Sequence, residues 1–252
     1  MSRSSLSLMK DTMLEQDFFQ RSVLEVAKDL VGMELVWHGS SGIIVETEAY
    51  TVEGDDASHT AYRPSTREFV KVMPPGAAYV YFNYGMYWLF NLLVKGGPRD
   101  GLVLIRALEP RDGVETMKRR RKKEHLHELC SGPGKLAMAL GITGEAHGTP
   151  MVGPLRPEGV GLRRPSEPLA PGQVVAEDIR VGISKAVDFQ WRFLALDHAH
   201  VSVPHGRVKV PGASPSAGRL AKQKPGTKAK TKQKSQSGSS AVKKSRSRKD
   251  GL

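Results

Sequence analysis

The pattern of apolar and polar residues predicts both helices and strands, with no internal repeat. Apolar side chains recur near a 3.6-residue period over residues 16–31, which indicates an amphipathic helix with Asp17 as its N-cap and Gly32 at its C-terminal end. Residues 34–37 and 42–50 have the composition of strands and are joined by a Gly-Ser-Ser-Gly turn. The first fifty residues therefore predict one helix followed by two strands.

Further apolar blocks follow a predicted loop at 51–68, which is rich in Asp, Gly, Pro and Thr. The elements expected beyond this loop are strands within 77–94 and at 101–110, a charged helical segment at 111–129, a helix that begins near Ser131 with Pro133 in its first turn, and short strands around 178–184 and 190–196. Because turns link these strands more often than helices do, we expect a single mixed α+β domain. Its sheet is expected to be curved, mainly antiparallel and flanked by helices.

The charge of the chain is concentrated in one terminal segment. The formal net charge is +12, but residues 213–252 alone contain twelve Lys or Arg and one Asp, which leaves a net charge of +1 for residues 1–212. The terminal segment is rich in Lys, Ser and Gly and has no aromatic residue, so it cannot bury enough apolar surface to fold. We expect a disordered N-terminus at 1–13, a folded domain at 14–205 and a disordered basic tail at 206–252. Such a tail either binds a polyanion or only keeps the protein in solution.

Composition also indicates the cellular setting. No run of 18 or more apolar residues is present, so no membrane-spanning segment is expected. The single cysteine, Cys130, excludes an internal disulfide framework and is interpreted as a packing residue. These features predict a cytoplasmic protein.

The stretch GIIVETEAY contains the first candidate chemistry, because two carboxylates interrupt an apolar strand. A period of two places Ile44, Glu46, Glu48 and Tyr50 on one face of the strand, with the carboxylates about 6 to 7 Å apart. One interpretation is a strand that leaves the core and enters a cleft. The other is an edge strand that charge protects from pairing.

A metal site built on carboxylates is a further possibility. Potential ligands occur at Glu46, Glu48, Asp55, Asp56 and His59, and in the stretch EHLHE. Their spacing matches neither a zinc-binding helix nor a calcium loop, so we expect no metal and no cofactor.

Tyrosines and isolated cations form a second group of candidates. Four of the six tyrosines lie within YVYFNYGMY, and Tyr84 precedes Gly85 at a predicted turn, where a side chain could wedge between base pairs. Arg106 is a single charge within the apolar run LVLIRALE and needs an anionic partner. Lys135 in SGPGKL begins a helix suited to phosphate contact, and KRRRKK at 118–123 adds positive charge.

These stretches together resemble one known family, the alkyladenine DNA glycosylases, also called 3-methyladenine DNA glycosylases of the mammalian type. The resemblance is carried by GIIVETEAY, the acidic loop that ends in His59, YVYFNYGMYWLFN, VLIRALEP and CSGPGKL, in the family's order from about Leu14 to Val203. It implies an enzyme that flips damaged purines out of double-stranded DNA and excises them. Implied substrates are 3-methyladenine, hypoxanthine and similar bases.

The resemblance also implies roles for single residues. Glu48 matches the general base that activates water, Arg106 matches an arginine near this water and the DNA backbone, and Glu46 is expected to be structural and to pair with an arginine. Side chains that match the base pocket are Tyr50, His59, Tyr81 and Asn91, the last of which discriminates against the exocyclic amine of guanine. Tyr84 matches the intercalating side chain, and Lys135 is assigned to DNA binding.

No motif supplies a lysine nucleophile, so we expect a monofunctional enzyme that leaves an abasic site without cutting the strand. We further expect a monomer that associates with the nucleoid. The stretch TAYRPSTREF and the Phe82-Asn83 pair depart from the family pattern and leave the substrate range and the fit of the wedge open. Two alternatives remain: a non-catalytic nucleic-acid-binding protein on the same scaffold, and a metal-dependent hydrolase.

Overall fold

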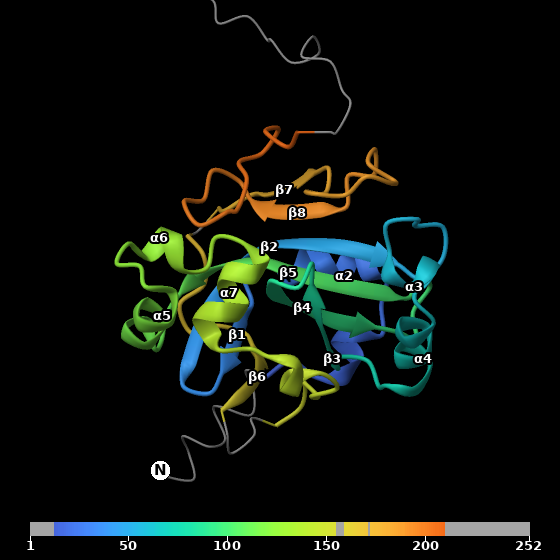
Figure 1. The fold of residues 1–252 in the computed structure, drawn as a ribbon, viewed down its shortest axis with the longest axis horizontal. Coiled ribbons are helices and arrows are strands. Elements are labelled where there is room, and N and C mark those ends of the chain that lie inside the picture. The colour runs from blue at the N-terminus through green and yellow to red at the C-terminus, as the bar shows by residue number, and fades with distance from the viewer. Residues whose placement is uncertain (1–12, 155–158, 171, 210–252) are drawn as a thin grey trace, which may run out of the picture. The chain divides into compact units, whose positions relative to one another are not determined.

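The computed structural model describes residues 13–154, 159–170 and 172–209, which form a single α+β domain around one curled antiparallel sheet (Figure 1). The strands, in chain order, are β1 (Glu34–Trp37), β2 (Ser40–Thr51), β3 (Ala78–Asn83), β4 (Tyr87–Val94), β5 (Gly101–Pro110), β6 (Val160–Arg163), β7 (Val175–Asp178) and β8 (Arg192–Ala195). Their order in the sheet is β3-β4-β5-β2-β1-β6, and β8 pairs with both β2 and β7. The predicted fold class is confirmed.

Strand β2 lies at the centre of the sheet and changes its neighbour along its length. It pairs with β5 on one side, while on the other side β1 pairs with its first residues and β8 pairs with residues 46–48. Its register against β5 shifts on both sides of Glu46, so Val45 and Arg106 have no directly opposed residue. The predicted alternation is therefore interrupted at Ile44, which packs with Val45 in the hydrophobic core instead of sharing the face of the glutamates.

The helices flank the sheet at two ends. Their bounds are η1 (Gln16–Phe19), α2 (Val23–Asp29), α3 (His59–Tyr62), α4 (Pro64–Val72), α5 (Val114–Arg121), α6 (Leu126–Leu129), α7 (Pro133–Leu140) and η2 (Gly144–Ala146). Helices α3 and α4 stand at one end of the sheet, and α5, α6 and α7 gather at the other (Figure 1). Helix α2 packs on β2 and β5.

The prediction of one continuous helix over residues 16–31 is wrong. A break separates η1 from α2, because the backbone N–H of Val23 donates to the carbonyl of Arg99 and turns the chain toward that loop. Asp17 consequently lies inside η1, and Ser22 occupies the N-cap position of α2. Gly32 follows the helix with a positive φ of 96° and donates its N–H to the carbonyl of Ile44, which ties the helix end to β2.

The predicted loop at 51–68 is also wrong in part, because α3 and α4 begin within it. Ser58 caps α3 by accepting a hydrogen bond from the N–H of Thr60, and Pro64 begins α4 as a first-turn proline. Phe69 and Val70 turn the apolar side of α4 toward the sheet end. The tertiary contacts of this helix, rather than a long apolar period, stabilise it.

The later predictions agree with the structure more closely. Strand β5 has the predicted bounds, the predicted strands at 77–94 form a hairpin, and Pro133 stands in the first turn of α7 behind Gly132 as N-cap. Strand β7 ends where a strand at 178–184 was expected to begin, and β6 was not predicted. The two-residue turn before β2 consists of His38 and Gly39, both with positive φ, rather than Gly39 to Gly42.

Contacts of the described residues reach beyond each predicted domain boundary. Met13 is buried and pairs with Arg163, and the N–H of Gly206 donates to Asp178 Oδ2 at 2.8 Å. Residues 1–12 and the tail from 210 lie outside the described residues, so their predicted disorder stays a prediction.

No helix among the described residues is long and apolar enough to cross a membrane.

A buried hydrogen bond joins α2 to β2, and its loss should destabilise the domain. Thr47 Oγ1 donates to the carbonyl of Ala27 at 2.7 Å, with Thr47 fully buried. The isosteric change Thr47→Val leaves this carbonyl without its donor and should lower the free energy of unfolding by about 1 to 3 kcal/mol. Urea denaturation monitored by circular dichroism measures the change. An unaltered or higher stability would contradict the structural role of this bond.

Candidate active site

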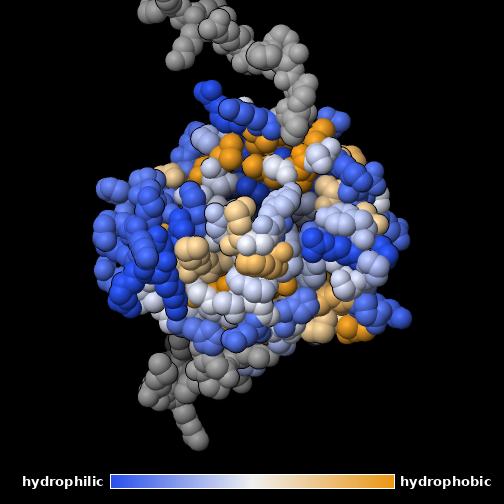
Figure 2. Space-filling model, in the orientation of Figure 1, coloured by the Kyte–Doolittle hydropathy of each residue, from blue (hydrophilic) through white to orange (hydrophobic). Residues whose placement is uncertain are grey.

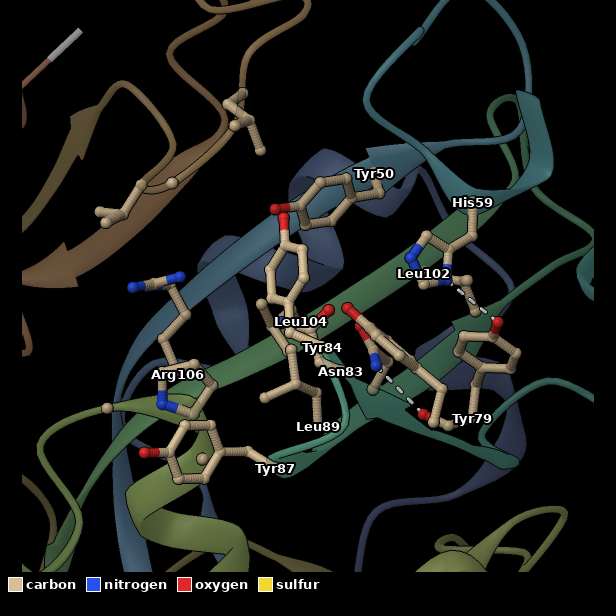
Figure 3. A pocket seen from close by; sticks show the side chains of 18 of the residues that line it. Tyr50, His59, Tyr79, Asn83, Tyr84, Tyr87, Leu89, Leu102, Leu104 and Arg106 are labelled. Atoms are coloured by element: carbon tan, nitrogen blue, oxygen red, sulfur yellow. Dashed lines mark hydrogen bonds between the residues drawn. The ribbon is translucent and has the colours of Figure 1, made fainter. Parts of the chain in front are cut away.

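One cavity of about 590 Å³ opens between β2 to β5, α3, the start of α7 and the loop that contains Val181 (Figure 3). In Figure 3, Arg106 enters it from one side, and His59 and Tyr79 face it from the other. Seven of the eight predicted site residues line it: Tyr50, His59, Tyr81, Tyr84, Asn91, Arg106 and Lys135. The structure therefore gathers on one cavity residues that are spread over almost ninety positions of the sequence.

The eighth predicted residue, Glu48, is fully buried directly behind the cavity wall. Its Oε2 accepts hydrogen bonds from the Tyr50 hydroxyl at 2.8 Å and from Arg106 Nη1 at 3.2 Å, and its Oε1 accepts one from the backbone N–H of Val181 at 2.6 Å. All three donors belong to residues of the cavity wall. A carboxylate offers about four acceptor positions, so these bonds hold Glu48 in place and leave about one position free.

Arg106 compensates the charge of both strand glutamates. Its Nε donates to Glu46 Oε1 at 3.0 Å, its Nη1 to Glu48, and its Nη2 to Ser202 Oγ at 3.2 Å. Burial alone would lower the pKa of this guanidinium, but the Glu48 and Glu46 carboxylates raise it above its ordinary value. The expected proximity of Glu48 and Arg106 is confirmed, and the site has a permanent cation against its carboxylates.

Glu46 is a structural junction rather than part of the cavity wall. Besides Arg106, it accepts hydrogen bonds from Arg192 Nη1 at 2.8 Å and from the backbone N–H and hydroxyl of Ser202 at 2.6 and 2.9 Å. Arg192 continues to Asp178 Oδ2 at 2.7 Å. The expected pairing of Glu46 with an arginine is confirmed, and it involves two arginines.

Aromatic side chains form the wall opposite Arg106. The rings of His59 and Tyr81 lie 4.2 Å apart between centroids, and His59 Nδ1 is 3.1 Å from the hydroxyl of Tyr79. Burial, assisted by the charge of Arg63, lowers the pKa of His59 to about 4, so this imidazole is neutral near pH 7. Burial, and secondarily Glu48, raises the pKa of Tyr50 well above its ordinary value, so its hydroxyl remains a donor. The cavity thus offers uncharged aromatic faces beside a buried carboxylate.

Asn91 is buried in β4 and oriented by the backbone. Its Nδ2 donates to the carbonyl of Tyr79 at 3.1 Å. Its Oδ1 has no hydrogen-bond partner among the described residues and belongs to a side chain of the cavity wall. The amide group is therefore held in one orientation at the cavity wall.

Two predicted DNA contacts lie at the mouth of the cavity. Tyr84 is 83% exposed at the tip of the β3–β4 hairpin and has a positive φ of 48°, so its side chain projects from the turn. Lys135 is exposed at the start of α7, where its Nζ donates to Ser131 Oγ at 3.2 Å. The cationic run 118–123 covers the last turn of α5 and the two residues after it, and Figure 2 shows strongly hydrophilic surface on that side of the molecule. Arg121 from this run reaches the cavity wall.

Comparison with known proteins decides the family. The family model described as Methylpurine-DNA glycosylase (MPG) matches residues 17–199. The chain belongs to the methylpurine-DNA glycosylase family. The predicted resemblance is thereby confirmed, and the protein is a DNA glycosylase, a glycosidase of base-excision repair.

Curated relatives agree with this assignment. A protein of Bradyrhizobium diazoefficiens is 44% identical over 180 residues, which cover 71% of this chain and 86% of the relative. A protein of Rhodopseudomonas palustris is 42% identical, with 77% and 90% covered, and one of Agrobacterium fabrum is 43% identical, with 74% and 91% covered. Each of the three carries the name "Putative 3-methyladenine DNA glycosylase".

Three carboxylates considered as metal ligands, Glu46, Glu48 and Asp55, are engaged by arginines or backbone amides, which leaves the metal hypothesis without support from their geometry. Asp55, a proposed ligand, forms a two-point bond with Arg180 at 2.6 and 2.8 Å. Within the part of the chain that the structure describes, no three His, Cys, Asp or Glu side chains are grouped to hold a metal ion.

Sequence reasoning missed the residues that support Glu48 and Glu46 from the second half of the domain. Val181, Arg192 and Ser202 bind these carboxylates directly, Asp178 binds Arg192, and Arg180 beside Val181 binds Asp55. A usable signal existed for the two arginines, because each interrupts an apolar run, in DIRVGI and WRFLAL, as Arg106 does in LVLIRALE. Val181 and Ser202 each contribute a backbone N–H group, which no residue pattern reveals, and Ser202 adds its hydroxyl.

The low pKa of His59 makes a testable contribution to stability. The folded value is about 4 and the ordinary value 6.5, so as pH falls from 6.5 to 4 the unfolded chain gains a proton at this residue that the folded chain does not. Stability present above pH 6.5 should therefore be lost across this window. The loss of melting temperature between pH 7.5 and 4.5 should be smaller for His59→Gln than for the wild type.

The matched control is the exposed residue His125, whose change to Gln should leave the wild-type pH dependence intact. Equal losses of melting temperature in wild type and His59→Gln would contradict a half-buried neutral imidazole.

Proposed function

We propose that this glycosylase flips alkylated or deaminated purines, including 3-methyladenine and hypoxanthine, out of double-stranded DNA and excises them hydrolytically. The product is an abasic site in an unbroken strand. The observation that carries the proposal is the position of Glu48, fixed by three donors directly behind an aromatic cavity. The name that the curated relatives share supports the choice of 3-methyladenine as one substrate.

Hydrolysis of the N-glycosidic bond requires a carboxylate near the sugar. As the bond from C1′ to the base breaks, its electron pair leaves with the base and positive charge develops on the sugar. The water oxygen bonds to C1′ and its proton passes to Glu48, whose charge also stabilises the developing cation. A water that reaches the free acceptor position of Glu48 has to lie among Tyr50, Arg106 and Val181, the wall residues that surround the carboxylate.

The aromatic wall accounts for the choice of base. Tyr50, Tyr81 and neutral His59 present π faces, which attract a cationic alkylated purine and stack on a neutral one. A methylated cationic base leaves without further protonation. Neutral hypoxanthine is attracted less strongly by the π faces of the site. Asn91, fixed by Tyr79, is assigned the discrimination against the exocyclic amine of guanine.

Contacts at the cavity mouth hold the opened duplex. Tyr84 projects far enough from the hairpin to fill the gap that a flipped nucleotide leaves, and Lys135 and the α5 surface bind backbone phosphates. One chain contains all the residues used in this scheme, so the proposed unit is a monomer on double-stranded DNA.

A monofunctional reaction is proposed because the lysine on the cavity wall is poorly suited to attack. A nucleophilic lysine needs burial or a cationic neighbour that favours its neutral form. Lys135 is exposed and donates to Ser131, so it is assigned to phosphate contact instead.

Single-turnover release of hypoxanthine from a defined duplex tests the role of Glu48. Glu48→Gln keeps the shape of the side chain but removes the base and should slow release by about 100-fold or more. The control is Glu34→Gln. Glu34 on β1 is a buried carboxylate that pairs with Arg163 of β6, and neither residue lines the cavity. Released base and strand breaks are scored separately, before any treatment with alkali.

Release that depends on Glu48 and leaves the strand intact is the expected result. Strand breaks without alkali would contradict the monofunctional reaction. Tight DNA binding without release of any damaged purine would contradict the enzyme assignment and favour the non-catalytic binding protein.

A further inference from the structure

Arg180 is a fully buried cation immediately behind the cavity wall, and the reaction scheme above does not use it. Its Nη1 donates to Asp55 Oδ2 and to the carbonyl of Ala49, and its Nη2 donates to Asp55 Oδ1 and to the carbonyl of Ala186, at distances of 2.6 to 3.2 Å. Four bonds in the plane of one guanidinium fix its orientation. They leave its two flat faces free for stacking.

Two aromatic rings lie close to this guanidinium. Its central carbon lies 4.6 Å from the ring centroid of Tyr50 and 5.2 Å from that of Trp191. Tyr50 borders the cavity, whereas Arg180 and Trp191 do not. The ring of Tyr50 takes part in the cavity wall (Figure 3). The cation lies against this ring but does not line the cavity.

A cation on one face of an aromatic ring weakens the attraction of the opposite face for a second cation. The π electrons of an aromatic face attract positive charge, and a cation already bound on one side competes with a second cation on the other. The two cations also repel each other, because the ring between them is thin and screens their charges only weakly. Asp55 offsets part of this repulsion, because it is paired with Arg180 at two points. A neutral base on Tyr50 feels neither effect strongly.

We propose that Arg180 is a specificity-determining residue that weakens the preference of the Tyr50 face for cationic bases and so shifts excision toward neutral lesions. The inference rests on the proposed function, since it concerns which purines that cavity accepts. Arg180 acts through Tyr50, which it contacts, and does not itself line the cavity. Asp55 sets the strength of the effect.

The test compares two substrates in one enzyme. Single-turnover rates are measured for 3-methyladenine, which is positively charged in methylated duplex DNA, and for neutral hypoxanthine in a defined duplex. The ratio of the cationic to the neutral rate is the readout, because general damage to the fold or to Glu48 lowers both rates together.

Two variants should move this ratio in opposite directions. Arg180→Gln combined with Asp55→Asn removes both charges without leaving one buried alone and should raise the ratio by about three- to tenfold. Asp55→Asn alone leaves the cation without its counter-ion and should lower the ratio. The matched control is Arg163→Gln combined with Glu34→Gln, another two-point arginine–carboxylate pair, which should leave the ratio unchanged.

Equal falls of both rates in the double variant, or an unchanged ratio in folded Asp55→Asn, would overturn the proposal and leave Arg180 with a purely structural role. If the double variant does not fold, as judged by circular dichroism, the Asp55→Asn ratio alone decides. Wild-type enzyme that releases neither base would refute the proposed function itself, which is a different outcome from normal release with an insensitive ratio.

Discussion

The pairing of Arg106 with Glu46 and Glu48 is the interaction on which the rest of the site depends. Strand β2 buries two carboxylates two residues apart, and without a cation each would carry a large desolvation cost. Arg106 reaches both from the neighbouring strand β5, at the position where the register between the two strands shifts. Removing one partner of a buried pair of this kind typically costs about 3 to 5 kcal/mol. The contacts that offset the cost of burying these carboxylates also hold Glu48 in place beside the cavity wall.

A network of ion pairs and hydrogen bonds connects this cluster to segments that are distant in the sequence. Arg192 on β8 joins Glu46 to Asp178, and Ser202 covers Glu46 from the end of the domain. On the other side, the loop with Arg180 and Val181 meets Tyr50 and Glu48. These late segments thus add Val181, Gly182 and Ile183 to the cavity wall and supply further donors that immobilise the carboxylates. Catalysis of this kind relies on groups that are oriented before the substrate arrives.

The sequence was informative where a residue contradicts its local pattern. Glu46, Glu48 and Arg106 are charges in apolar strands, and all three proved to be one buried cluster. Tyr84 before a glycine correctly marked an exposed turn. The sequence was uninformative where long-range contacts decide: the break before α2 depends on Arg99, α4 depends on packing at the sheet end, and the bulge that redirects Ile44 depends on the register with β5. Local periodicity contains none of these contacts.

The central claim is that Arg106 contributes to excision by holding Glu48, and a double-mutant cycle tests it most directly. Arg106→Lys keeps the charge but loses the forked geometry, and it is combined with Glu48→Gln in single-turnover release of hypoxanthine. The account predicts that Arg106→Lys slows the wild type by about tenfold or more but slows Glu48→Gln by less than about twofold. An equal factor in both backgrounds would show that the two residues act independently, and it would contradict the account.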